Sequence, residues 1–406
     1  MSTKSIAPAA PARAGAPREA PPRPVRLLVI GEEHVRVKAA RHYLALAEHG
    51  IEAHMYADDR SGITRDVVKK YPVPVRYAPN PSTGVKGLLA YWREFRRYFN
   101  EVRPDVVEVQ TSINFAATLP MMLYARMRGV PRIVVCRGEL YPPAFQAMGR
   151  AARGLLVAAL RSATLVLYKE LYMEAILERI APGVRRFFWS NAVPVRPEPS
   201  LEREGEHVVF MNFFWKRRNL DLIIRAAPLV RREVPGVRFH LVGSTRAMVD
   251  KSQFYAGLYE NEKELSALID ELGAGEYVTV EPFTVEVDAH LSRAKVYLFP
   301  ADQVFCNYGL LEAMERGVPP IVSADRDPDA LRVVEDGVSG RVVPLTPEAL
   351  AAAIVELLGD ERRRQALGRG ARDKVRAEYD LSRWTGALAE LYRELTAARA
   401  KAGPGD

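Results

Sequence analysis

Short apolar runs alternate with helical patterns along most of the chain. In the first half, strands are expected at 25–30, 52–56, 75–77, 105–110, 132–136 and 164–168, and helices at 37–48, 88–100 and 116–128. In the second half, strands are expected at 208–214, 238–242, 277–280, 296–299, 320–322 and 341–343, with helices between them. Repeated strand–helix units of this kind predict a parallel sheet covered by helices, which is an α/β fold class.

A Pro- and Glu-rich stretch at 194–206 interrupts this alternation and indicates a boundary between two domains. A chain of 406 residues is also too long for one typical core. The expected organisation is a disordered tail at 1–24, an N-terminal Rossmann-like domain at 25–198, a linker at 199–206, a C-terminal Rossmann-like domain at 207–380, and a final helix at 381–400 that packs back on the N-terminal domain. Since doubly wound sheets bind ligands beyond the carboxyl ends of their strands, a cleft between the domains is the expected site.

Charge and cysteine content narrow the class of protein. Residues 1–200 carry 30 Lys and Arg against 17 Asp and Glu, whereas residues 201–406 carry 28 against 33. A basic first half favours an anionic partner, such as a phosphorylated substrate or an anionic membrane surface, with a solvated basic surface as the alternative. Cys136 and Cys306 each lie in or beside an apolar run, which indicates a reducing cytoplasm and not a disulfide framework. No apolar run reaches the roughly 18 residues of a membrane span.

The expected helix at 88–100 interleaves aromatic and basic residues. Its aromatic side chains are those of Trp92, Phe95, Tyr98 and Phe99, and three arginines lie among them. One interpretation is a helix that lies on an anionic bilayer. The favoured interpretation is a crossover helix whose aromatic face is buried in the core.

Short motifs follow one another in a fixed order in the second half. They are N-L-D-L-I-I-R-A-A at 219–227, F-H-L-V-G-S at 239–244, L-F-P at 298–300, L-L-E-A-M at 310–314, G-V-P at 317–319 and E-D-G-V-S-G at 335–340. In this order they resemble the C-terminal domain of the family-four glycosyltransferases. The segments at 129–138 and 190–193 are similar to the family's N-terminal domain. The resemblance implies the GT-B fold, in which two doubly wound domains face a cleft, and a retaining transfer of a hexose-type sugar from a nucleoside diphosphate to a hydroxyl acceptor.

The chain departs from the family at the two glutamates that lie eight positions apart. Glu312 matches the second, which in the family holds the ribose hydroxyls, but Val304 stands at the first. The donor sugar then needs another polar contact, and Asp302 is the nearest carboxylate. Gln303 and Asn307 are the alternatives.

The leaving diphosphate develops negative charge, which an enzyme without a metal must meet with cations and backbone N–H groups. In the family, a Gly-Arg pair and a Lys five residues later lie near the diphosphate, after the first strand of the C-terminal domain. The resemblance puts Asn212-Phe213 at the position of the Gly-Arg pair and Arg218 at the position of the Lys. The start of the helix after Asn307 is a further anion site by its geometry. The expected donor-binding residues are Glu312, Arg218, Lys216, Arg217, Asn307, Gly309 and Gly243. A solvated loop is the alternative for the basic triplet.

On the acceptor side, Glu33 and His34 stand where the family has two glycines, and Arg137 stands where it has a histidine. His34 is a candidate base or phosphate ligand, with an ordinary surface histidine as the favoured alternative. Arg137 suits a phosphate or a carboxylate, and Glu139 is placed to pair with it. The catalytic candidates are therefore Asp302, His34 and Arg137.

No metal and no cofactor is expected apart from the nucleotide sugar, and the two D-x-D matches at 325–329 are typical of chance in an acidic loop. The expected partners are that donor and a hydroxyl acceptor in glycan, glycolipid or secondary-metabolite biosynthesis, and no nucleic acid. A lipid-phosphate carrier and peripheral contact with the inner membrane face stay open. The competing functions are a non-catalytic subunit of the same fold and a sugar-nucleotide epimerase.

Overall fold

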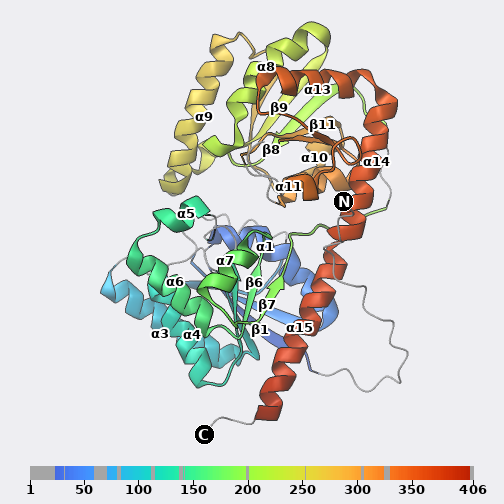
Figure 1. Cartoon of the computed structure of the whole chain (residues 1–406). Helices are drawn as coiled ribbons and strands as arrows, with labels where there is room; N and C mark the ends of the chain where they lie inside the picture. The colour runs from blue at the N-terminus through green and yellow to red at the C-terminus, as the bar shows by residue number, and fades with distance from the viewer. Residues whose placement is uncertain are drawn as a thin grey trace, which may run out of the picture. The chain divides into compact units, whose positions relative to one another are not determined.

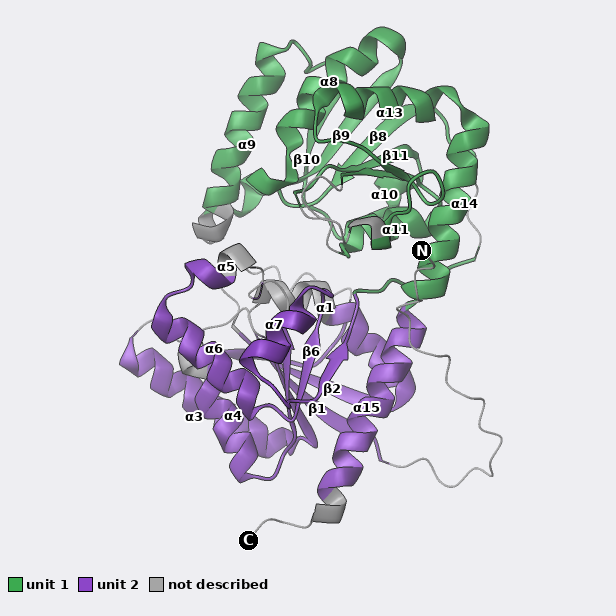
Figure 2. Ribbon diagram, in the orientation of Figure 1, with its two compact units in different colours: residues 1–7, 191–380 green, residues 8–190, 381–406 purple. Residues whose placement is uncertain are grey.

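The computed structural model describes residues 23–31, 33–58, 71–79, 84–110, 115–136, 140, 142–197, 201–251, 253–302, 306–323 and 330–402. Most of the expected disordered tail, residues 1–22, lies outside them. The described chain forms two compact units (Figure 2). The C-terminal unit contains residues 191–380, and the N-terminal unit contains the described residues up to Ser190 together with those from Leu381 onward. The chain thus changes unit after Ser190, whereas the expected N-terminal domain ends at residue 198.

The N-terminal unit is built on a seven-stranded sheet in the order β3-β2-β1-β4-β5-β6-β7. All of its strand pairs are parallel. The strands are β1 (Val25–Gly31), β2 (Ile51–Asp58), β3 (Val75–Ala78), β4 (Val106–Gln110), β5 (Arg132–Cys136), β6 (Leu165–Tyr168) and β7 (Arg186–Phe188). Of these, only the three-residue β7 is missing from the strands expected in this half, because its sequence R-F-F is too short to show a period.

Helices cover both faces of this sheet (Figure 1). On β4, Val107 and Val109 face the core beneath α3 and α4, whereas Glu108 between them faces α1 and α15. The helices are α1 (Glu33–Leu46), α3 (Val85–Val102), α4 (Phe115–Met127), α5 (Pro142–Ala147), α6 (Arg150–Ser162), α7 (Met173–Ile180) and α15 (Leu381–Ala402). Since successive strand residues point to opposite faces, β4 is packed on both sides, as in a doubly wound sheet.

A buried carboxylate joins three elements of the N-terminal unit. Glu108 is fully buried on β4, where it accepts hydrogen bonds from Tyr43 of α1, from Gln110, and from Tyr392 of α15 at 2.7 Å. Burial, with the charge of Glu108, raises the pKa of Tyr392 well above its ordinary value, so the tyrosine stays a donor. These bonds hold α15 against the sheet.

The C-terminal unit repeats the design with six parallel strands in the order β10-β9-β8-β11-β12-β13. The strands are β8 (Glu206–Met211), β9 (Val237–Ser244), β10 (Val278–Pro282), β11 (Ala294–Phe299), β12 (Pro320–Val322) and β13 (Arg341–Val342). The helices and turns are η2 (Lys216–Arg218), α8 (Leu220–Glu233), η3 (Arg246–Lys251), α9 (Gln253–Glu271), α10 (Asp288–Leu291), α11 (Tyr308–Glu315), α12 (Ala330–Val333), α13 (Pro347–Gly359) and α14 (Glu361–Glu378). The strand order reverses between β8 and β11, and such a reversal is where doubly wound sheets bind ligands.

Most sequence-based expectations for the elements are confirmed, and one strand is corrected. Thr346 caps α13 by accepting from the N–H group of Ala349. Phe95, Tyr98 and Phe99 of α3 are buried, so the favoured interpretation of this helix is confirmed. The strand expected at 208–214 ends instead at Met211, because the following residues leave the sheet to form the turn η2.

Candidate functional site

The candidate site lies at the carboxyl ends of β8, β9 and β11 in the C-terminal unit. The loops after β8 and β9 approach each other so closely that a Cβ atom on Gly243 would lie 1.8 Å from the carbonyl oxygen of Asn212. Gly243 also has a φ of +152°, which other residues rarely adopt. Gly243 was expected to contact the donor. The close packing of the two loops is by itself a sufficient reason for a glycine at this position.

Arg218 follows β8 on the turn η2 and is a buried cation. Only 7% of the residue is exposed, and its guanidinium group lies 4.7 Å from the centre of the Phe299 ring. Burial, together with the nearby charge of Arg217, lowers the pKa of Arg218 to about 9, while Tyr297 and Asp302 act in the opposite direction. The side chain thus remains a cation at neutral pH within a shielded environment, where its charge acts strongly on an anion.

Asp302 is joined to the loop that carries the basic triplet. Its side chain accepts a hydrogen bond of 2.9 Å from the amide of Asn219, which also donates to the carbonyl of Pro300 at 2.9 Å. The N–H group of Asp302 donates to the carbonyl of Arg217 at 3.0 Å. Asn219 has a φ of 52°, a conformation that asparagine tolerates. The loops after β8 and β11 are therefore clamped together around Asp302.

Glu312 lies on α11 and is 9% exposed. It lies close enough to Tyr297 of β11 to help raise the pKa of that phenol, which burial raises most and which Arg218 lowers. The Tyr297 hydroxyl donates to the carbonyl of Met211 at 3.1 Å. The charges of Arg218 and Glu312 thus both influence the pKa of Tyr297, and the charge of Asp302 influences the pKa of Arg218. The structure gathers these three expected residues at the point where the strand order reverses.

The first turn of α11 is occupied by its own cap. The Asn307 side chain accepts from the N–H groups of Gly309 and Leu310. A Cβ atom on Gly309 would lie 2.7 Å from the Tyr297 hydroxyl and 2.8 Å from the carbonyl oxygen of Met211. Two of the N–H groups expected to meet phosphate are therefore already hydrogen-bonded, and Gly309 is required by close packing.

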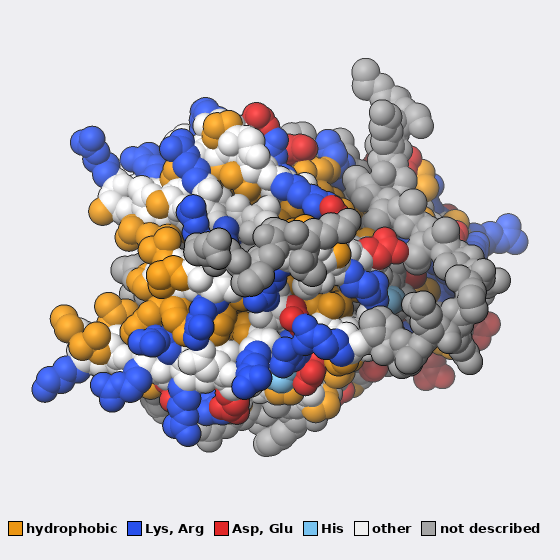
Figure 3. Space-filling view, turned by 90° about the horizontal axis from the view of Figure 1, so that it is seen from below, with side chains coloured by type: hydrophobic (Ala, Val, Ile, Leu, Met, Phe, Trp, Pro, Cys, Tyr) orange, Lys and Arg blue, Asp and Glu red, His pale blue; other side chains and the backbone are white. Residues whose placement is uncertain are grey.

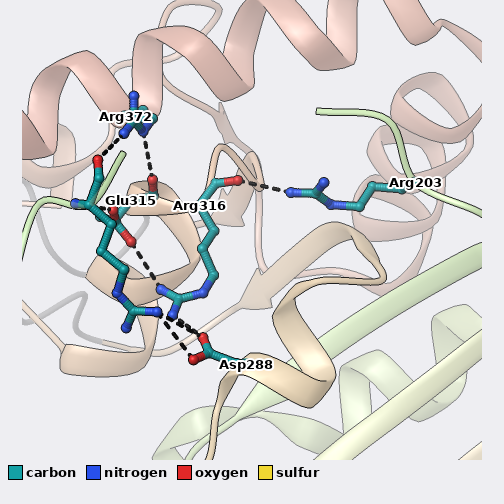
Figure 4. A network of polar contacts seen from close by, with 6 residues as sticks. Arg203, Asp288, Glu315, Arg316 and Arg372 are labelled. Atoms are coloured by element: carbon teal, nitrogen blue, oxygen red, sulfur yellow. Dashed lines mark hydrogen bonds and ion pairs between the residues drawn. The ribbon is translucent and has the colours of Figure 1, made fainter. Parts of the chain in front are cut away.

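A network of charged groups anchors the other end of α11 (Figure 4). Buried Glu315 accepts from the N–H group of Arg196 at 2.9 Å and pairs with Arg316 at 3.0 Å. Arg316 and Arg196 both bind Asp288, and their charges lower the pKa of this carboxyl although partial burial opposes the shift. Arg372 donates to the carbonyl of Glu315 at 3.1 Å. The helix that carries Glu312 is thus held firmly at both ends.

The remaining two basic residues of the triplet are exposed. Lys216 forms an ion pair of 3.0 Å with Glu264 of α9, and about three quarters of its side chain is exposed. The guanidinium group of Arg217 lies 5.6 Å from the centre of the Trp215 ring. For Lys216 this geometry favours the solvated loop that was the alternative interpretation.

Several expected site residues lie outside what the structure describes. Arg137 and Glu139 are among them, as are Gln303 and Val304. Glu33 and His34 begin α1, but their side chains are not described. The acceptor-side and base assignments to these residues therefore stay predictions.

Three positioning residues were missed by sequence reasoning. An asparagine directly before a helix, such as Asn219, is locally a signal for a helix cap. Its side chain instead donates to Asp302, which is distant in the sequence, so no local pattern indicates this contact. Asn191 of the S-N-A-V segment donates to the carbonyl of Cys306 at 2.6 Å, directly before Asn307. Tyr297 lies within an apolar strand, where a tyrosine gives no local signal of its role.

Two further findings concern metal sites and membrane spans. Within the described ranges, no group of three or more His, Cys, Asp or Glu side chains is placed to hold a metal ion. None of the helices in this part of the chain is long and apolar enough to cross a membrane.

Both halves of the chain match models of glycosyltransferase domains. Residues 195–374 match the family described as "Glycosyl transferases group 1", and residues 35–191 match a "Glycosyl transferase 4-like domain". Together the two matches cover every strand of the C-terminal sheet and every strand of the N-terminal sheet except β1.

Curated relatives are similar over about half of their own length. A GDP-mannose-dependent alpha-(1-6)-phosphatidylinositol monomannoside mannosyltransferase of Mycolicibacterium smegmatis is 31% identical over 216 residues, which are 48% of this chain and 50% of that protein. The enzyme of the same name from Mycobacterium tuberculosis is 29% identical over 244 residues, 55% of this chain and 58% of that protein.

Solved structures share the fold across nearly the whole chain. Sucrose-phosphate synthase from Thermosynechococcus elongatus superposes with a TM-score of 0.74 at 18% identity, covering 92% of this chain and all of that one. Anabaena HepE, solved with UDP and glucose, gives a TM-score of 0.73 at 16% identity, covering 91% of this chain and all of that one. At such identities the likeness concerns the fold alone, and it confirms the expected GT-B class.

Proposed function

Because this chain belongs to the family-four-like glycosyltransferases of the GT-B fold, we propose that it transfers a hexose-type sugar from a nucleoside diphosphate to a hydroxyl acceptor, with retention of configuration. The observation that carries the proposal is the gathering of Arg218, Asp302 and Glu312 where the strand order of the C-terminal unit reverses. A cation, a carboxylate on a clamped loop and a carboxylate on an anchored helix are the groups that a nucleotide sugar requires.

Each of the three residues has a separate task in this proposal. Glu312 accepts hydrogen bonds from the ribose hydroxyls. Arg218 faces the diphosphate, where its shielded charge stabilises the negative charge that develops as the sugar leaves. Asp302 orients the sugar in place of the glutamate that Val304 has replaced. This division assigns nucleotide affinity to Glu312 and Arg218, and turnover to Asp302. No metal or further cofactor takes part.

The relatives direct the choice of donor and acceptor. Two of them are named as GDP-mannose-dependent enzymes that act on a phosphatidylinositol mannoside. GDP-mannose is therefore the first donor to test, with UDP-sugars as the comparison. We extend the proposal to an acceptor hydroxyl carried on a lipid phosphate, and to work at the inner face of the cytoplasmic membrane. The basic first half of the chain supports this extension because it favours an anionic partner.

The direct test screens nucleotide sugars by thermal shift and then measures transfer with the donors that bind. A ligand at 100 times its dissociation constant stabilises a protein by about 2.7 kcal/mol, which gives a readable shift. In the matched variant Glu312→Ala, affinity for the parent nucleoside diphosphate should fall by roughly 1.5–3 kcal/mol, the loss of a charge-assisted hydrogen bond. An unchanged affinity would remove Glu312 from the site.

The screen also separates the competing functions. Saturable nucleotide binding with neither donor hydrolysis nor transfer on a broad acceptor panel would favour a non-catalytic subunit. Conversion of the donor sugar in the absence of any acceptor would favour an epimerase.

A further inference from the structure

The exposed face of α3 and α4 carries apolar side chains that are not buried in the core. Among the described residues, seven large hydrophobic side chains are exposed, and four of them lie on these two helices: Val85, Leu89, Leu123 and Met127. Met127 and Val85 are the most exposed, at 75% and 74%. More than half of the exposed large hydrophobic side chains therefore fall on one pair of neighbouring helices. Scattered surface leucines need no explanation, but this concentration does.

The aromatic residues of α3 bind its neighbour and do not form this face. Tyr124 of α4 packs edge-on against Trp92, Phe95 and Phe99, with ring centres 5.1 to 6.1 Å apart. These contacts join the two helices through their buried sides. The opposite side of α3 presents Leu89 to solvent, together with Arg93 one turn and Arg96 and Arg97 two turns further along the helix.

The same face is strongly basic. Helices α3, α4 and α6 contain only two acidic residues, Glu94 and Glu101, and Arg76 of β3 pairs with both, at 3.0 and 2.7 Å. The basic residues of these three helices number eight: Lys86, Arg93, Arg96, Arg97, Arg126, Arg150, Arg153 and Arg161. Within the described ranges, Arg93, Arg97 and Arg126 form no ion pair, and all three are exposed. The positive charge is therefore available to an external anion.

From this geometry we infer that α3 and α4 form a docking surface for an anionic lipid bilayer. Leu89, Leu123 and Met127 enter the boundary between head groups and acyl chains, and the surrounding arginines bind the lipid phosphates. Figure 3 shows hydrophobic side chains gathered on the side where Figure 1 draws α3 and α4, with Lys and Arg side chains around them. Apolar residues surrounded by cations match an anionic bilayer surface, because acyl chains contact the apolar side chains and lipid phosphates bind the cations. A soluble phosphate would bind the cations but would make no contact with the exposed leucines and methionine.

The test measures binding of the full chain to vesicles of phosphatidylcholine with phosphatidylglycerol, and to phosphatidylcholine alone. The full chain should bind the anionic vesicles much more strongly. In the double variant Arg93→Gln/Arg97→Gln, binding should weaken by about 25-fold, because each arginine near an anionic surface contributes about fivefold. Leu89→Gln and Met127→Gln should each weaken it by about tenfold, since an apolar side chain no longer enters the lipid.

Matched controls distinguish this surface from general charge and hydrophobicity. Arg225 and Arg232 are exposed arginines of α8, and Val338 is 51% exposed in the C-terminal unit. Arg225→Gln/Arg232→Gln and Val338→Thr should bind vesicles like the unmodified chain.

Three results would overturn the inference. The first is that the unmodified chain does not bind anionic vesicles, and the second is that binding survives the substitutions on α3 and α4. The third is a change of oligomeric state in those variants during sedimentation, which would assign the face to contact between protein molecules. Nucleotide thermal shifts on the same variants keep the two proposals apart. If the unmodified chain binds nucleotide but not vesicles, only the docking surface is contradicted. If it binds vesicles but not nucleotide, only the proposed activity is contradicted.

Discussion

Asp302 makes a contact within the protein, and this defines the test of its role. Its carboxylate accepts from Asn219, so Asp302→Ala removes this side-chain bond of the clamp together with the proposed sugar contact. Asn219→Ala removes the clamp and keeps the carboxylate. If Asp302 orients the sugar, Asp302→Ala should lower kcat strongly, by tenfold or more, and leave affinity for the nucleoside diphosphate nearly unchanged. Asn219→Ala should have a much smaller effect. Equal losses of kcat in both variants would reduce Asp302 to a loop clamp.

Arg218 is a cation already withdrawn from water, which makes it a specific partner for a diphosphate. Arg218→Ala should weaken binding of the nucleoside diphosphate by roughly 1.5–3 kcal/mol, because a charge-assisted hydrogen bond is lost. Binding of the free nucleoside should change little. Calorimetric titration with the two ligands measures the difference, and Arg218→Lys serves as the charge-preserving control. Losses of the same size for both ligands would show that Arg218 acts only through the packing of its loop.

At the scale of elements, a histidine cluster links β8, β9 and α10. His240 contacts His207 at 2.9 Å and Glu281 at 2.6 Å, and His290 lies 3.6 Å from the same carboxylate. Burial lowers the pKa values of all three histidines below the ordinary value of about 6.5. Protons therefore bind more readily to these groups in the unfolded chain.

This difference predicts acid sensitivity of the C-terminal unit. The stabilising effect of neutral histidines is complete above about pH 6.5 and is lost as the pH falls toward the lowered pKa values of the folded state. The urea midpoint should therefore decrease from pH 7 to pH 5, with a smaller decrease for His240→Gln. A slope that His240→Gln leaves unchanged would assign the acid sensitivity to other groups.

For the whole molecule, the two proposals assign different ligands to different units. The donor site belongs to the C-terminal unit, and the lipid surface belongs to the N-terminal unit. Hydrogen exchange on the full chain should therefore show protection around 212–219 and 298–312 with a nucleoside diphosphate, and around 85–102 and 115–127 with anionic vesicles. Protection of α3 and α4 by the nucleotide alone would contradict this division.

Much of the fold follows from the sequence, because strand and helix periods and turn residues are local signals. The doubly wound units and the buried aromatic face of α3 were both expected on that basis. The motif order identified the family, and the domain models confirm it. Local pattern did not reveal β7, which is too short to show a period, nor the early end of β8, which depends on how the next residues leave the sheet.

The sequence by itself therefore determined the fold class and the family, since these depend on periodicity and on short motifs. Only the tertiary structure decided what each residue touches. It buried Arg218, placed Lys216 against Glu264, turned Asn307 into a helix cap and joined Asp302 to Asn219. The reason is physical: hydrogen bonds and burial depend on loops from different strands meeting at one sheet edge, and no local pattern specifies how those loops meet.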